Sequence, residues 1–248
     1  MPWDAANATL DALRARIRAL ELGADRGEVE AVPLDLPVID DALPWGGLPR
    51  GVLHEIVAAG PGAAEGFAAA LLARFIEGRG PALWCLARGD LFGPGLGAFG
   101  LAPDRLIVAR ARHGDDVLWA MEEGLRSGVP GAVLGEPRRL DLAAGRRLQL
   151  AARAGGVACL VLRLPGKAKF ETSAAVTRWR VAAAPSLPPD DLPGLGAPCW
   201  RVELLRCRGA VPQEWFLEWN NETCHFAVVS LLGERAPGPP PAAYRRIV

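Results

Sequence analysis

Hydrophobic residues near the start of the chain recur at helical spacing, with arginines between them. The apolar positions are Leu10, Leu13, Ile17 and Leu20. Steps of three and four place them on one stripe, so the pattern predicts an amphipathic helix over residues 4–22. The following residues, 24–37, have mixed charge and two prolines. We therefore expect residues 1–37 to form an N-terminal helix followed by a linker or an extended arm.

From Val38 onward, short apolar runs alternate with helical patterns. The apolar runs predict strands at residues 51–57, 81–86, 106–108, 132–134 and 157–162. The segments between them predict helices at 66–77, 95–99 and 141–153, and one beginning at Asp115 with Val117, Leu118, Met121 and Leu125 on its inner face. Alternation of this kind predicts an α/β fold, in which helices cover both faces of a mostly parallel sheet.

The last third of the chain changes to strict alternation of polar and apolar residues. It predicts antiparallel strands at 177–183, 199–206, 215–219 and 226–231, joined by hairpins. We expect them to extend the C-terminal side of one domain over residues 38–233. Residues 234–248 hold four prolines and too few apolar side chains to fold alone, which predicts a Pro-rich tail.

Charge and cysteine content restrict the classes of function. The chain has 28 basic and 28 acidic residues, which disfavours nucleic-acid binding by overall charge. Its five cysteines are scattered without metal-ligand spacing, so we expect reduced thiols and no metal site. The longest apolar run is too short and too charged to span a bilayer, and no signal peptide is expected, which favours a cytoplasmic protein without membrane contact.

Residues 38–66 carry a first resemblance. They read Val-Ile-Asp-Asp-Ala-Leu, then Gly-Gly-Leu-Pro-Arg-Gly-Val-Leu-His-Glu-Ile, then Gly-Pro. This order resembles the start of the RecA core, where a helix, a strand and the phosphate loop follow one another. Residues 94–108 and 199–219 resemble later RecA segments, so the resemblance covers roughly residues 38–230 and implies a RecA-like core.

Several strings resemble the ImuA family more closely than RecA. They are Trp119-Ala-Met-Glu-Glu-Gly-Leu-Arg126, Gly135-Glu136 with Leu140-Asp-Leu, Arg146-Arg-Leu-Gln-Leu-Ala-Ala152, Thr177-Arg-Trp-Arg180 and Trp200-Arg-Val-Glu-Leu-Leu-Arg-Cys-Arg208. The resemblance implies an accessory factor of the SOS response that supports translesion synthesis and mutagenesis. Its implied partners are RecA and ImuB, an inactive homologue of Y-family polymerases, and indirectly a DnaE-type polymerase.

The stretch that corresponds to the phosphate loop departs from a working one. Such a loop reads Gly-x-x-x-x-Gly-Lys-Ser/Thr, because backbone N–H groups and the lysine hold the phosphates while the hydroxyl holds Mg²⁺. Here the stretch runs from Gly60 through Gly62 to Gly66, and Phe67 and Ala68 stand at the lysine and hydroxyl positions. A lost ion pair at ~4 Å is worth ~4 kcal/mol at an effective dielectric near 20. We therefore expect no cofactor and no ATP hydrolysis.

Three further sets of residues are candidates for function. Glu136 falls near the metal-supporting aspartate of RecA, although a structural carboxylate is the simpler interpretation. The segment after the strand at 157–162 holds possible DNA contacts at Arg163, Lys167, Lys169 and Phe170, through phosphate pairing and stacking; an ordinary solvated loop is the alternative. A basic strip or a solvated face is formed by Arg138, Arg139, Arg146, Arg147 and Arg153.

The histidines and most of the tryptophans are expected to have structural roles. His54, His113 and His225 lack metal-ligand spacing, and we expect each to be structural. Most of the eight tryptophans are expected in the core, including Trp179, Trp200, Trp215 and Trp219, and an exposed one would mark a protein-binding face.

The sequence favours a non-catalytic adaptor and leaves three alternatives. The leading one is a regulator that caps or modulates RecA filaments. A SulA-like inhibitor of cell division and an ATPase with an unorthodox site are the others.

Overall fold

A computed structural model describes residues 30–87, 91–164, 172–186 and 196–229. The predicted helix at 4–22 and the Pro-rich tail lie outside these residues. The strands are β1 (Ala31–Val32), β2 (Leu48–Pro49), β3 (Leu53–Ala58), β4 (Ala82–Leu86), β5 (Leu106–Arg110), β6 (Ala132–Gly135), β7 (Ala158–Arg163), β8 (Thr177–Ala183), β9 (Cys199–Cys207), β10 (Gln213–Asn220) and β11 (His225–Val228). The α-helices are α2 (Pro37–Asp40), α3 (Ala63–Phe75), α4 (Gly93–Leu96), α5 (Gly114–Ser127) and α6 (Leu142–Gly155), with 3-10 turns η1 (Gly97–Phe99) and η2 (Pro103–Arg105).

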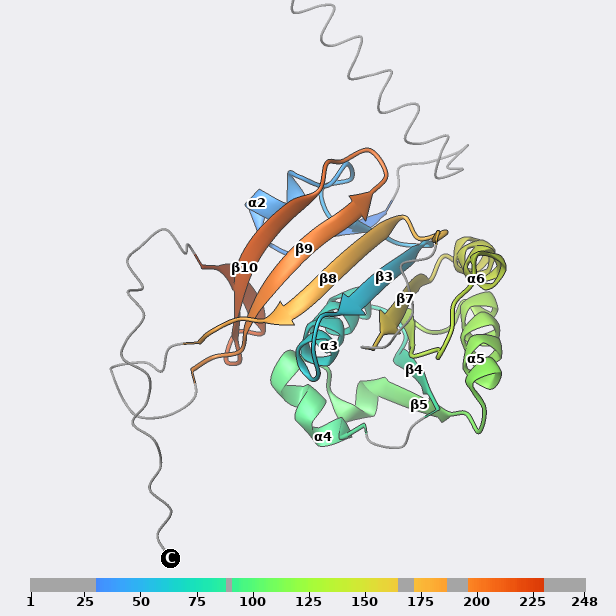
Figure 1. The fold of residues 1–248 in the computed structure, drawn as a ribbon. Coiled ribbons are helices and arrows are strands. Elements are labelled where there is room, and N and C mark those ends of the chain that lie inside the picture. The colour runs from blue at the N-terminus through green and yellow to red at the C-terminus, as the bar shows by residue number, and fades with distance from the viewer. Residues whose placement is uncertain (1–29, 88–90, 165–171, 187–195, 230–248) are drawn as a thin grey trace, which may run out of the picture.

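Nine strands form one sheet in the order β11-β10-β9-β8-β3-β7-β6-β4-β5 (Figure 1). The six strands from β8 to β5 are parallel, whereas β9, β10 and β11 pair antiparallel. β3 lies inside the parallel part, where Ile56 stands between Leu162 of β7 and Trp179 of β8. The predicted α/β sheet with a C-terminal antiparallel extension is confirmed.

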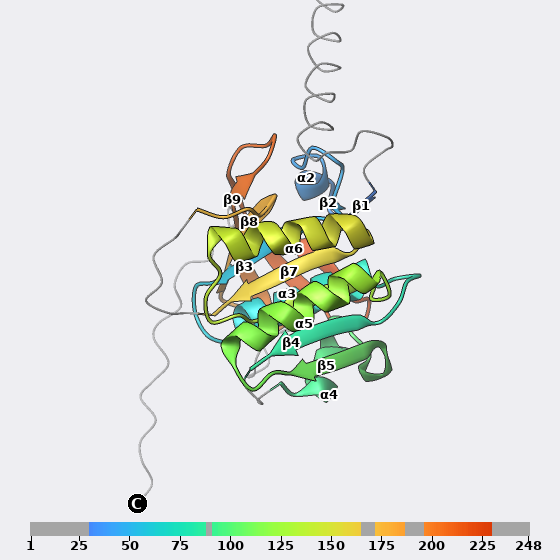
Figure 2. The same cartoon turned by 90° about the vertical axis from the view of Figure 1, so that its right-hand side faces the viewer.

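Helices cover both faces of the parallel part. α3 packs on one face, and α5 and α6 lie side by side on the other (Figure 2). Each face has its own core, with Phe67 and Trp84 on the α3 side and Leu53 and Met121 on the other. The inner face predicted for α5 is buried at Val117, Met121 and Leu125, and Leu118 is half-buried. Parallel strands buried on both sides read as the apolar runs seen in the sequence.

The segment before α2 is an arm that packs against the domain. Leu34 and Leu36 are buried in the core on the α3 side, and β1 pairs with β2. The backbone N–H groups of both leucines donate to the Asp40 carboxylate at 2.9 and 3.0 Å. Asp40 thus ties this arm to the domain, because its two oxygens satisfy donors that burial removes from water.

Candidate functional site

The turn between β3 and α3 lies at the position that corresponds to the phosphate loop in the sequence comparison with RecA. We expected α3 to begin at Gly66, but it begins at Ala63, directly after Gly62. Gly62 has φ 82°, a left-handed conformation that glycine adopts without strain. Ala63 and Ala64 favour helix, and Glu65 in the first turn interacts well with the helix dipole. Only a short turn containing Gly60 therefore separates strand from helix, and Gly66 lies within the helix.

Gly66 is explained by packing. A Cβ atom at this position would lie 2.7 Å from the ring of Phe99, closer than real side-chain atoms approach. The missing side chain therefore lets the ring tip of Phe99 in η1 pack against α3. The glycine that invited comparison with a phosphate loop has a steric reason of its own.

The two positions that correspond to lysine and hydroxyl are inside the core. Phe67 is 1% exposed and Ala68 is fully buried. The Phe67 ring meets Trp200 edge-on with 5.9 Å between centroids and lies 5.6 Å from Phe226. An aromatic cluster under the antiparallel strands consists of Phe67, Phe99, Trp200, Trp219 and Phe226. It anchors the extension to α3 through apolar contact, and ring pairs add modestly to the energy of burial.

Glu136 follows β6 and contacts a buried tryptophan. Its carboxylate accepts a hydrogen bond from Trp84 Nε1 at 2.7 Å, and its backbone N–H donates to the Cys85 carbonyl at 3.0 Å. Trp84 is fully buried, so its N–H needs this acceptor. The arrangement agrees with the structural interpretation of Glu136.

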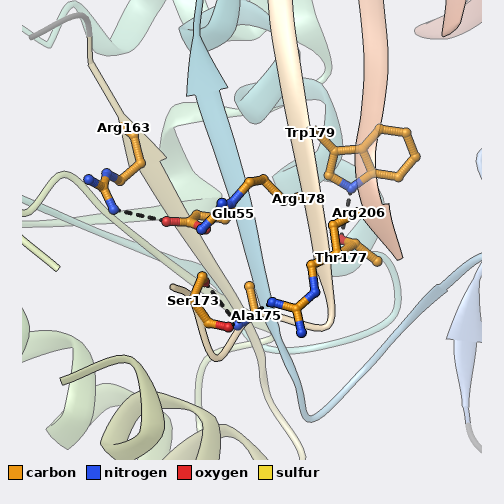
Figure 3. A network of polar contacts seen from close by, with 8 residues as sticks. All are labelled: Glu55, Arg163, Ser173, Ala175, Thr177, Arg178, Trp179 and Arg206. Carbon is orange, nitrogen blue, oxygen red and sulfur yellow. Dashed lines mark hydrogen bonds and ion pairs between the residues drawn. The ribbon is translucent and has the colours of Figure 1, made fainter. Parts of the chain in front are cut away.

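A buried ion triad joins three strands of the sheet (Figure 3). Glu55 of β3 is 1% exposed and accepts from Arg163 Nη1 of β7 at 3.0 Å and from Arg178 Nε of β8 at 2.7 Å. Two cations compensate one carboxylate, as a buried charge requires. Arg163, considered for DNA contact, is held in this triad; Lys167, Lys169 and Phe170 lie outside the described residues. Glu55 was missed at the level of sequence, although a carboxylate within a buried strand is itself a signal.

A chain of hydrogen bonds orients His54 on the opposite side of β3. Trp179 Nε1 donates to Thr177 Oγ1 at 2.8 Å, and that hydroxyl lies 2.8 Å from His54 Nδ1. His54 Nε2 lies 2.9 Å from the Pro49 carbonyl. A carbonyl only accepts, so Nε2 carries the proton and Nδ1 accepts from Thr177. Burial lowers the pKa of His54 to about 4, although the bond to Pro49 opposes the shift. His54 is therefore a neutral structural histidine, as predicted.

The low pKa of His54 predicts a pH-dependent stability. The unfolded chain binds this proton near pH 6.5 and the folded chain only near pH 4. The stabilisation is complete above pH 6.5 and falls as the pH drops toward 4, by about 3 kcal/mol in all. Urea unfolding should show that the free energy of unfolding of the wild type falls by this amount between pH 6.5 and pH 4. The free energy of unfolding of His54→Asn, which is less stable at pH 7, should lack this contribution because the variant has no histidine to titrate there. Equal pH dependence in both proteins would contradict the assignment.

Among the residues the structure describes, no three His, Cys, Asp or Glu side chains lie together as metal ligands. All five cysteines are free thiols, and burial raises the pKa of Cys85 to about 12. Within the same part of the chain, no helix has the length and apolar character needed to cross a bilayer.

Comparison with known proteins identifies relatives of the whole domain. No family model matches the chain. It is 43% identical over 216 residues to Protein ImuA of Caulobacter vibrioides, in strain NA1000 / CB15N and equally in strain ATCC 19089 / CIP 103742 / CB 15. The match covers 80% of this chain and 88% of each relative. At this identity and coverage, the chain belongs to the ImuA family.

Proposed function

We propose that this protein is a non-catalytic adaptor of the ImuA–ImuB mutagenesis system, acting in translesion DNA synthesis after damage. Its proposed partners are ImuB and RecA, and through them a DnaE-type polymerase, in the cytoplasm. Membership of the ImuA family supports the system. The observation that carries the non-catalytic role is the burial of Phe67 and Ala68 where a phosphate loop would place lysine and hydroxyl.

The sheet supports a RecA-like core for this adaptor. The strand that precedes the glycine-containing turn, β3, is flanked by parallel strands on both sides, and α3 follows the turn directly. With the ammonium and hydroxyl replaced by core packing, a triphosphate would lack its main cationic and metal-linked contacts. Without a γ-phosphate to change a subunit interface, partner binding is expected to be independent of nucleotide.

Co-purification with ImuB tests the proposal. We expect the full chain and ImuB to form one peak in size-exclusion chromatography, with the same affinity in the presence and absence of ATP and Mg²⁺. Calorimetric titration of the chain alone with ATP and Mg²⁺ should release no binding heat. Separate elution from ImuB, or nucleotide binding that changes the affinity, would overturn the adaptor role. Growth of RecA filaments on single-stranded DNA distinguishes the alternative, because a filament regulator would stop or alter growth without ImuB.

A further inference from the structure

α5 and α6 pack side by side on one face of the sheet (Figure 2). Both helices return from one parallel strand to the next, so they run in the same direction. Arg147 of α6 lies 3.7 Å from the Glu122 carboxylate of α5. Near their C-terminal ends the backbones almost touch, since a Cβ on Gly155 would lie 1.9 Å from the Leu125 carbonyl oxygen. A ligand can therefore contact both helices without entering a gap.

Two large apolar side chains on this face point away from the core. Trp119 of α5 and Leu150 of α6 are each 65% exposed, while the other tryptophans considered for the core are buried. Trp119 lies three residues before Glu122, and Leu150 lies three residues after Arg147. They therefore flank the ion pair on opposite sides along the helices. Core packing explains neither side chain.

The two helices differ in the charges that surround Trp119 and Leu150. α6 contains Arg146, Arg147 and Arg153 and no acidic residue, and Arg146, Leu150 and Arg153 recur at steps of four and three, which makes one stripe. On α5, Glu122 already pairs with Arg126 and Arg147. The remaining acidic residues of α5 are Asp115, Asp116 and Glu123. The stripe on α6 thus places positively charged side chains next to the exposed apolar side chain of Leu150.

We propose that this α5–α6 face, made of Trp119, Arg146, Arg147, Leu150 and Arg153, docks an acidic segment of a partner protein. Apolar side chains of that segment would cover Trp119 and Leu150, and its carboxylates would meet the arginines. A helix with apolar residues on one side fits a surface formed by two parallel helices. Nucleic acid is the less favoured ligand, because its phosphates would pair with the arginines but leave Leu150 uncovered. This inference rests on the proposed function in one respect: the proposed function also assigns the protein a role in binding other proteins.

A designed peptide tests the surface. The probe is a labelled amphipathic helix of about 16 residues, with leucines along one side and glutamates at both borders of that side, and its binding to the full chain is followed by fluorescence anisotropy. We expect Trp119→Ala, Leu150→Ala and Arg146→Glu each to weaken binding by about tenfold. The matched control is Val211→Ala, because Val211 is 66% exposed and lies outside both helices. A second peptide, with glutamine in place of glutamate, should bind at least about tenfold more weakly than the first.

The outcomes separate this inference from the proposed function. Failure of the acidic peptide to bind, or equal binding by Trp119→Ala and wild type, would overturn the docking surface even if ImuB co-purifies. Trp119-dependent binding without ImuB co-purification would instead support the surface and contradict the adaptor role. If a labelled DNA duplex binds more tightly than the acidic peptide and loses affinity in Arg146→Glu, the face is a nucleic-acid site and the inference is wrong.

Discussion

Replacement of Glu55 with alanine is expected to lower the free energy of unfolding by about 3–5 kcal/mol. The carboxylate is buried and holds Arg163 and Arg178 from the two neighbouring strands. Their side chains are themselves mostly buried, so its removal leaves two cations with little water and no anion between them. Urea unfolding at pH 7 measures the loss directly.

Two further variants separate ion compensation from simple loss of contact. Glu214→Ala breaks a bidentate pair with Arg201 on the exposed part of β9 and β10, and its unfolding midpoint should stay nearly unchanged, because water and salt screen exposed pairs. The triple variant Glu55→Met, Arg163→Met, Arg178→Met should recover much of the stability lost in Glu55→Ala, since no charge is left uncompensated. An unstable triple variant would show that the triad stabilises by its specific geometry.

The parallel sheet was predictable because its signals are local. Each buried strand is an apolar run bounded by turn residues, as in residues 157–162, which fall within one residue of β7. The start of α6 was also readable, because Asp141 caps it by accepting from the Ala144 N–H at 2.7 Å. These features depend on neighbours a few residues apart, which a single sequence shows.

The features that escaped prediction depend on distant partners. Glu55 meets Arg163 and Arg178 across 108 and 123 residues, and no local pattern reports such a pairing. The sequence left residues 24–37 as a linker or an extended arm, because the burial of Leu34 and Leu36 depends on a core cluster built largely from residues far along the chain. The glycine at 66 suggested a loop, and only its contact with Phe99 shows why glycine is needed there.

The same limit applies to the candidate site. The absence of lysine and hydroxyl at 67 and 68 is visible in the sequence, but the aromatic cluster around Phe67 comes from η1, β9, β10 and β11, far along the chain. Trp119 was readable as a tryptophan on a helix, yet its exposure depends on how α5 packs against β4, β6 and α6. Tertiary packing therefore decides which polar and aromatic side chains remain exposed for contact with a partner.

Restoring the phosphate-loop residues with Phe67→Lys and Ala68→Thr is expected to destabilise the protein by at least about 4 kcal/mol without creating ATP binding. Loss of a buried phenylalanine ring alone costs about 3–5 kcal/mol, and the new ammonium would stand against Trp200 and Phe226, where a cation–π contact offsets only part of the lost hydration. Urea unfolding and calorimetric titration with ATP and Mg²⁺ measure the two effects.

Phe92→Lys provides the matched control for the ring and the charge. Phe92 is 71% exposed, so the same chemical change there should alter stability by no more than about 0.5 kcal/mol. A stable Phe67→Lys, Ala68→Thr variant that binds ATP would mean that the lysine reaches the turn at Gly60 and Gly62 and that the backbone still holds phosphate. The turn would then need only two side chains to hold a triphosphate, and the proposed non-catalytic role, which rests on the burial of Phe67 and Ala68, would be wrong.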